Sequence, residues 1–310
     1  MSKTLSKNPS EETVPSREAA NGTTGSLAFH AWMAGTAVAV LLVSVFGCWL
    51  TQVHVPEVGG RILAAFIVTA AFQAVPLYWH RKGRIALRES SLTVLWAAVL
   101  WIALPFHVDV AARLGRAFPL RDPVFARIDA HLGMNVAALA QWARLHWVGR
   151  AVNACYALLL LLLVLAFLLP GLSGKATAVK RLLVGNLVAF AVGLPFFACL
   201  PAVGPWYGEH FAPNRIQVSC QTEVMSLRAP GPYEHRPAGV ICFPSFHVMW
   251  AILCAAALAS FRRLRWPAWI VAALVVASTM TTGWHYFSDV LGGIALAAVS
   301  LAAARWMVRE

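Results

Sequence analysis

Charged residues are scarce in this sequence, and acidic residues are scarcer still. Only 12% of the 310 residues are Asp, Glu, Lys or Arg, whereas a soluble domain carries about 25%. Apolar residues make up 59% of the chain, and the mean hydropathy is +0.67. This composition argues against a soluble globular protein and indicates that the lipid bilayer is the solvent.

The 13 acidic residues are outnumbered by 25 basic ones, which gives a net charge of +12. A basic excess can indicate a nucleic-acid-binding protein, because basic patches attract phosphate backbones. No nucleic-acid-binding motif accompanies the charge here, and the basic residues gather in short loops between apolar runs. They indicate membrane topology and headgroup contact instead, so we expect a membrane and no nucleic acid as partner.

Other features are missing as well. Residues 1–28 are largely polar and lack the apolar core of a signal peptide, which predicts a disordered cytoplasmic tail. No internal repeat is visible, although many transporters have one. No further cluster of His, Cys and Glu adjoins the candidate site described below, so we expect no metal and no cofactor.

Apolar runs separated by short turns fill most of the chain. About 20 helical residues cross the hydrocarbon core of a bilayer, and eight spans are expected, at 29–50, 61–79, 92–106, 151–169, 182–200, 248–261, 266–280 and 290–307. Residues 108–149 mix arginines, aspartates and tryptophans at helical spacing, which predicts amphipathic helices at the membrane interface. The expected fold is all-α, a polytopic membrane helix bundle. It has N-terminal spans in 29–107, interfacial helices in 108–149 and a second membrane domain in 150–310.

The basic turns predict the topology. With the N-terminus inside, the turns at 80–88, 174–181 and 262–265 all face the cytoplasm. The long connection 201–241 then faces outward, as in a multi-pass protein of the cytoplasmic (inner) membrane with its loops in the periplasm. The arginines of 108–149 disagree, because they also fall outside.

Two motifs in the C-terminal half carry histidine. Cys242–His247 is CFPSFH, and Thr282–Gly293 is TGWHYFSDVLGG. Between them lie two apolar runs that are broken by the basic turn 262–265. If both runs cross the membrane, the chain leaves after His247 and returns just before His285. This hairpin predicts that the two histidines meet on one face of the bilayer.

The first motif suits an anion site. Proline is common in the first turn of a helix, and the free amides of such a terminus attract anions. Ser245 adds a hydroxyl donor, and His247 can give or take a proton. A capping serine and an interfacial histidine would explain the same residues.

The second motif adds a carboxylate. His285 and Asp289 are four residues apart, so they share a helix face, and Asp289 can fix the tautomer of the imidazole. The free ring nitrogen is then a nucleophile or base. Gly283 gives room to turn before His285, and 292–293 (Gly-Gly) permits close helix contact. A purely structural His–Asp hydrogen bond remains the alternative.

Two of the six cysteines, Cys220 and Cys242, share the long outer connection. An oxidising compartment would allow a disulfide between them, which would tie the loop to the first motif. Two unpaired thiols are equally compatible with the sequence.

These motifs together resemble the type-2 phosphatidic acid phosphatase (PAP2) superfamily, and look closest to the branch that includes inositol phosphorylceramide synthases. The resemblance is close over 242–293 and loose from 119 onward. It implies a six-helix catalytic core within 150–310 that acts on lipid phosphoesters without a metal. It also implies His285 as nucleophile, Asp289 as its orienter, His247 as the acid for the leaving oxygen and Ser245 as a phosphate-binding residue.

The chain departs from this family at several positions. Thr279 occupies the place of an arginine, Phe246 replaces a glycine, and the motif with a lysine and an Arg-Pro pair has no clear match. Phosphoryl transfer needs cations or donors on the phosphate oxygens, so another residue has to supply them. Arg228 resembles the arginine of a Leu-Arg segment in the related branch, and Arg215 and Arg236 are further candidates. Each could equally be a solvated loop charge.

Three functions remain open from the sequence. The first is an integral-membrane phosphatase that hydrolyses a lipid phosphomonoester or pyrophosphate through a phosphohistidine, with its site outside. The second is a phosphotransferase that moves a phospho-headgroup to an alcohol. The third is a non-catalytic lipid-binding protein or a transporter. The lipid substrate and the oligomeric state are not encoded in these patterns.

Overall fold

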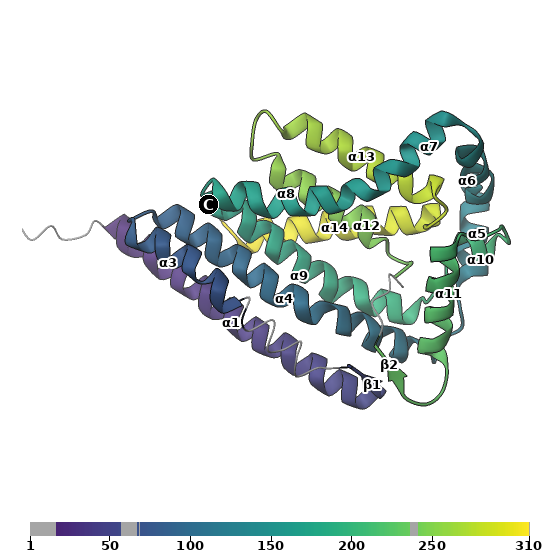
Figure 1. Ribbon diagram of the computed structural model, residues 1–310, viewed down its shortest axis with the longest axis horizontal. Helices are drawn as coiled ribbons and strands as arrows, with labels where there is room; N and C mark the ends of the chain where they lie inside the picture. The colour runs from purple at the N-terminus through teal and green to yellow at the C-terminus, as the bar shows by residue number, and fades with distance from the viewer. Residues whose placement is uncertain (1–16, 57–66, 68, 236–240, 310) are drawn as a thin grey trace, which may run out of the picture.

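The computed structural model describes residues 17–56, 67, 69–235 and 241–309 (Figure 1). In chain order its helices are α1 (Arg17–Thr51), α3 (Ala74–Arg81), α4 (Ile85–Gly115), α5 (Asp122–His131), α6 (Val136–Leu145), α7 (Trp147–Ala154), the 3₁₀ turn η1 (Cys155–Ala157), α8 (Leu158–Leu172), α9 (Ala176–Cys199), α10 (Pro205–Gly208), α11 (Arg215–Arg228), α12 (Phe246–Leu258), α13 (Arg265–Thr281) and α14 (Phe287–Met307). Two short strands, β1 (Val53–His54) and β2 (Tyr233–Glu234), form a parallel pair. The predicted all-α class is confirmed.

The long helices run between two ends of the bundle (Figure 1). One end, which we call the histidine end, holds α5, α6, α10, α11, the strand pair and the N-termini of α12 and α14. The other end, which we call the basic end, holds the turns at 82–84, 173–175 and 259–264 and the C-terminus. The basic turns therefore lie together, opposite both histidine motifs, as the predicted hairpin requires.

Exposed tryptophans mark both ends. Trp49 and Trp147 lie at the histidine end, and Trp266 and Trp306 lie at the basic end. Tryptophan is enriched at the two membrane–water interfaces, where its ring contacts lipid and its N–H contacts water. Their positions are those expected for a bundle that crosses a bilayer along its helices.

The helix lengths support a multi-pass membrane protein, with fewer full-length spans than the eight expected. Five segments of the described chain are long and apolar enough to cross a membrane: Ser26–Thr51, Ile85–Ile102, Trp147–Leu172, Ala176–Cys199 and Phe287–Met307. The expected span at 61–79 lies partly outside the described residues. The expected spans at 248–261 and 266–280 are helices of 13 and 17 residues. α12 can be short because it is packed among α8, α9, α13 and α14, and most of its side chains are buried.

Two predicted boundaries differ from the structure. Residues 17–28, expected in the disordered tail, belong to α1, and Ser26 Oγ donates to Glu89 Oε2 at 2.5 Å. α4 continues to Gly115, so the interfacial helices α5 and α6 begin only after residue 115 and not at 108. The polar residues that suggested an interface at 108–115 are buried by partners far along the chain. Asp109 Oδ2, for example, lies 2.5 Å from Nδ1 of His235.

Arg113 is one of the arginines that disagreed with the predicted topology. Its side chain is 2% exposed and lies inside the protein. The guanidinium donates to the carbonyl oxygens of Thr51, Leu227 and Ala229 at 2.8–3.2 Å, and also to that of Gly231. This charge holds α1, α4 and the end of α11 together, so it says little about the side of the membrane.

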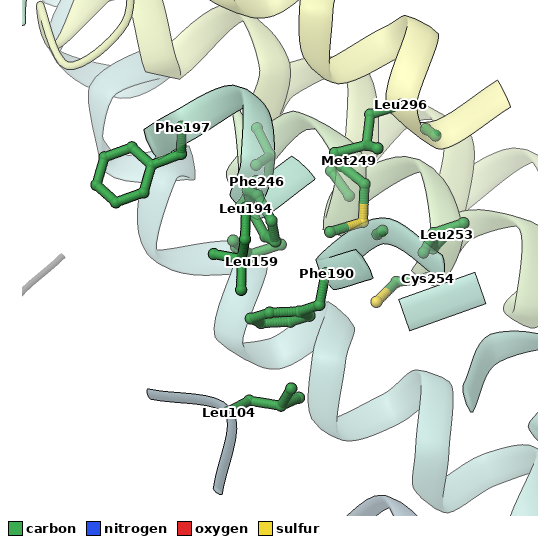
Figure 2. Close-up of a cluster of buried hydrophobic side chains, with 14 of the residues drawn as sticks. Leu104, Leu159, Phe190, Leu194, Phe197, Phe246, Met249, Leu253, Cys254 and Leu296 are labelled. Carbon is green, nitrogen blue, oxygen red and sulfur yellow. The ribbon is translucent and has the colours of Figure 1, made fainter. Parts of the chain in front are cut away.

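The apolar core lies where α9, α12 and α14 meet. Figure 2 shows its labelled side chains: Leu104, Leu159, Phe190, Leu194, Phe197, Phe246, Met249, Leu253, Cys254 and Leu296. Phe246, which stands where the resembled family has glycine, packs edge-on against the ring of Phe190. Gly193 leaves the space for it, since a Cβ there would lie 2.8 Å from the Phe246 ring. The core therefore fixes α12 against α14, whose N-termini carry the histidine motifs.

Candidate active site

The two histidines of the motifs meet at the histidine end. His247 is the second residue of α12, and His285 lies in the short connection between α13 and α14. Their ring centroids are 5.7 Å apart, although 38 positions separate them in the sequence. The predicted hairpin therefore brings both imidazoles to one place, close enough to contact a single phosphoester.

A tight turn after α13 sets the position of His285. Gly283 has φ of +76°, in the left-handed region that favours glycine. The backbone N–H groups of Trp284 and His285 both donate to the carbonyl of Thr279, at 3.0 and 3.2 Å. Thr279 itself is fully buried, and its hydroxyl donates to Val276 O. The residue in the family's arginine position thus supports the turn through its backbone.

Asp289 lies directly beside His285. Its Oδ2 atom is 3.4 Å from His285 Nδ1, and it accepts hydrogen bonds from the Tyr286 amide at 2.9 Å and the Cys242 thiol at 3.0 Å. His285 Nδ1 and Asp289 Oδ1 are both buried and have no hydrogen-bond partner among the described residues. The pair is at ion-pair distance, with one unused polar atom on each side.

Ser245 and Gly293 bring the two motifs into contact. Ser245 is the N-cap of α12: its hydroxyl accepts from Val248 N at 3.4 Å, and its own N–H donates to Asp289 O at 3.1 Å. A Cβ on Gly293 would lie 2.5 Å from Ser245 O, so only glycine allows this approach of α14. The structure therefore contains the capping role considered for Ser245.

Two aspartates in the α5 segment, which sequence reasoning did not single out, hold the start of α14. Asp129 accepts from the N–H groups of Phe287 and Ser288 at 2.5 and 2.8 Å. Asp122 accepts from the Tyr286 hydroxyl at 3.1 Å and from the amides of residues 203 and 204. The only sequence signal for these two aspartates was the mixture of aspartates and arginines in 108–149. Asp129 caps a helix that begins 158 residues later, and such a distant cap leaves no local pattern in the sequence.

Aromatic rings form a wall beside the histidines. Tyr156 is stacked on His247 with centroids 4.6 Å apart, and it also faces Trp284 at 6.3 Å. Trp206 meets Trp284 edge-on at 5.3 Å. These rings come from η1, α10 and the turn before α14, so the wall combines distant segments. It gives the site an apolar side that suits the lipid part of a substrate.

Arg228 does not contact the histidine pair. Its guanidinium donates to the carbonyl oxygens of Gly115 and Phe118, at 3.2 and 2.6 Å. It does interact electrostatically with Asp122, which touches Tyr286. Arg215 is exposed at the start of α11, and Arg236 lies outside the described residues. Within the described chain, no lysine or arginine is hydrogen-bonded or ion-paired to His247 or His285.

Burial controls the protonation of the groups in this site that lie outside the spans. Burial lowers the pKa of His285 to about 4, and a hydrogen bond with the Cys242 backbone opposes that shift. Burial, together with the nearby charge of Asp289, raises the pKa of the Cys242 thiol well above its usual range. At neutral pH the structure therefore holds a neutral His285 imidazole and a protonated Cys242 that donates to Asp289.

The same residues form the one group of potential metal ligands found in the described chain. Ligand atoms of Cys242, His285 and Asp289 lie within 4.8 Å of one another. The sequence argument that nothing adjoins the His–Asp pair was therefore wrong, because it overlooked Cys242. A metal ion would require the thiol to lose its proton and its hydrogen bond to Asp289. Cys242 forms no disulfide with Cys220, so the bridge considered from the sequence is not formed.

The family comparison matches this geometry. The model of the PAP2 superfamily matches residues 124–303, more than half of the chain and the whole region that holds the histidine pair. The chain belongs to the PAP2 superfamily. No curated protein and no solved structure matches it significantly. The membership supports a phosphatase or phosphotransferase type of function on lipids, carried by a multi-pass membrane protein.

Proposed function

We propose that this PAP2 superfamily protein is a lipid phosphatase that uses His285 as its nucleophile. The observation that carries the proposal is the convergence of His247, His285 and Asp289, with imidazole centroids 5.7 Å apart and the carboxylate 3.4 Å from His285 Nδ1. A neutral imidazole next to a carboxylate is an activated nucleophile, because the carboxylate stabilises the cation that forms on attack.

The proposed reaction has two steps. A ring nitrogen of neutral His285 bonds to phosphorus while the bond from phosphorus to the lipid oxygen breaks, and His247, which starts this step as a cation stabilised by the bound phosphate, gives its proton to that oxygen. Water then attacks the phosphohistidine, His247 takes a proton from this water, and inorganic phosphate leaves. Proton transfer of this kind accelerates a reaction by about 10²–10⁴-fold. An alcohol in place of water would make the enzyme a phosphotransferase.

Donors around the phosphate have to replace the missing arginine of the family. We propose that the first-turn amides of α12, at Phe246 and His247, supply part of the binding, because such amides have no intrahelical acceptor. The Ser245 hydroxyl lies at the same helix end. Arg228 and Arg121 are the proposed cations. Arg228 interacts electrostatically with Asp122. Arg121 directly precedes Asp122 in the chain, and its buried Nε has no hydrogen-bond acceptor in the described chain.

The proposal treats the Cys242–His285–Asp289 group as a hydrogen-bonded assembly that works without a metal. Its support is the thiol, which donates to Asp289 Oδ2 at 3.0 Å. The orientation of the site toward the periplasm is also proposed, and it rests on the basic turns at the opposite end.

The test is a panel of lipid phosphomonoesters and pyrophosphates in detergent, with each substrate labelled in its phosphoryl group. Wild-type protein should release phosphate and, after an acid-free quench, carry an alkali-stable label. His285→Ala should lose both by roughly 10³-fold or more. His131→Ala is the matched control, because His131 is exposed at the same end, in the last turn of α5.

Further arms of the same assay separate the alternatives. A candidate alcohol that yields a new phospholipid in place of free phosphate assigns transfer. A chelator that abolishes activity assigns the Cys242–His285–Asp289 group to a metal. Arg228→Gln and Arg121→Gln should raise KM, whereas Arg127→Gln, an exposed α5 arginine, should not. Phosphate release by His285→Ala at the wild-type rate would refute the nucleophile.

A further inference from the structure

A cavity of about 540 Å³ lies at the basic end of the bundle, away from the histidine pair. It is formed by the turn between α8 and α9 and by the C-terminal ends of α12 and α14. The lengths of α12 and α14 place it roughly 20–30 Å from the histidines, at 1.5 Å rise per residue. It is therefore a second site, separate from the proposed phosphatase centre.

Three basic side chains line this cavity: Lys175, Arg181 and Arg305. None of the described residues that line it is acidic. Lys175 Nζ donates to Ser260 O at 2.9 Å and lies 4.7 Å from the Phe261 ring centroid, so its amine is held at the rim. Arg181 Nε donates to Val308 O at 3.1 Å. Two of these cations come from α9 and its N-cap and the third from α14, and together they give the cavity a positive potential.

The backbone and the hydroxyl groups add to this character. The lining includes residues 174–178, which are the first turn of the 24-residue helix α9 and the turn before it. The α9 N-cap makes no side-chain hydrogen bond, so the positive end of the helix dipole faces the cavity without a capping oxygen. Thr177 and Ser260 also line it, and Leu253 and Leu301 contribute apolar surface.

The position of the cavity suggests the source of a ligand. Trp266 and Trp306, both exposed, flank the same end and mark the level of the lipid headgroups. A basic pocket between transmembrane helices at this level is a typical headgroup site. We propose that this cavity binds the phosphate group of an anionic ligand, supplied either by a phospholipid headgroup or by free phosphate. The inference does not depend on the proposed phosphatase activity.

The test measures the thermal stability of full-length protein in neutral detergent. The ligands are dioctanoyl phosphatidylglycerol, dioctanoyl phosphatidylcholine and inorganic phosphate. Lys175→Gln/Arg305→Gln removes two cavity charges. The matched control, Arg262→Gln/Arg263→Gln, removes two charges from an exposed turn at the same end that does not line the cavity. Arg305→Gln alone serves as a second variant, since Arg305 is exposed and its loss leaves the packing intact.

Phosphatidylglycerol should raise the Tm of the wild type and of the control pair, while phosphatidylcholine should not. The cavity variant should bind phosphatidylglycerol roughly 30-fold more weakly, because each basic residue near the membrane contributes about fivefold. An equal Tm shift from inorganic phosphate would assign the site to a free anion, and a lipid-only shift would assign it to a headgroup. Equal binding by the cavity variant and the control pair, or no shift in the wild type, would overturn the proposal.

Discussion

At the residue scale, burial decides the chemistry of this site more than charge does. His285 is 3% exposed and has a carboxylate beside it, yet burial still lowers its pKa to about 4. Between about pH 4 and 6.5 an unfolded chain would bind a proton at this histidine and the native chain would not. The native structure therefore keeps a neutral imidazole over the whole physiological range, which is the form a nucleophile needs.

The pH dependence of the reaction should reflect this shift. As pH falls through about 4, His285 takes up a proton and loses its nucleophilic lone pair, so kcat/KM should fall there and not near 6.5. The measurement is kcat/KM against pH with a short-chain lipid phosphate as substrate, and return of each sample to pH 7 checks for irreversible unfolding. An acid limb at pH 6–7 that belongs to His285 would contradict its burial.

At the scale of elements, the site depends on contacts between helix ends that are far apart in the chain. At the start of α14, the first two backbone N–H groups of the helix donate to the Asp129 carboxylate. Further along, Gly293 lets α14 approach the Ser245 carbonyl at the start of α12. α13 contributes the turn around Gly283. Each catalytic candidate lies at such an end, so small movements of α14 should alter the distance between the two imidazoles.

Gly293→Ala should therefore damage both stability and activity. The added Cβ would lie 2.5 Å from Ser245 O and 2.9 Å from Val248 Cβ, which forces α14 away at a cost of about 1–3 kcal/mol. Gly35→Ala is the matched control, because a Cβ there meets nothing within 4 Å and alanine favours a helix by about 0.5–1 kcal/mol. The measurements are Tm in detergent and kcat. Equal behaviour of the two variants would show that the close approach is unimportant.

At the scale of the whole molecule, charge and hydrophobicity are distributed along the bundle axis. The basic turns and the basic cavity share one end, while the histidine pair and the caps from α5 occupy the other. Arg113, which opposed this topology in the sequence, is buried and bonded to carbonyl groups. The basic turns agree with the positive-inside rule, whereas three exposed arginines at the histidine end, Arg116, Arg127 and Arg144, still oppose it.

Reporter fusions should confirm that orientation. A phosphatase reporter that is active only outside the cytoplasm should be active when fused after Gly231 and inactive when fused after Arg263. The basic turn 262–265 keeps the second site inside because short loops rich in Lys and Arg resist translocation. Expression of each fusion, checked by immunoblot, is the control. The reverse pattern would place the histidine end in the cytoplasm.

The sequence alone was sufficient for the features that follow from local pattern. Long apolar runs predicted helices, and the basic turn 262–265 predicted a hairpin. The spacing of His285 and Asp289 predicted that the two side chains lie close together, but not how: His285 precedes α14, and the turn before that helix, not a shared helix face, brings it to Asp289. The location of His247 and His285 at one end of the bundle could also be predicted, because a hairpin of two spans returns the chain to the same side of the membrane, whereas the 5.7 Å between their ring centroids comes from the packing.

Only the tertiary structure decided how the site is held and which residues complete it. Cys242 donates to Asp289, Asp129 caps α14, and Tyr156 stacks on His247. In each of these contacts the two partners are more than 40 positions apart in the sequence. Nor could the sequence show that Arg228 is bound to carbonyl groups of the α4 end, or that α12 is short because other helices cover it. Hydropathy and spacing report what a residue prefers locally, whereas these contacts depend on which distant groups the packed helices bring within hydrogen-bonding distance.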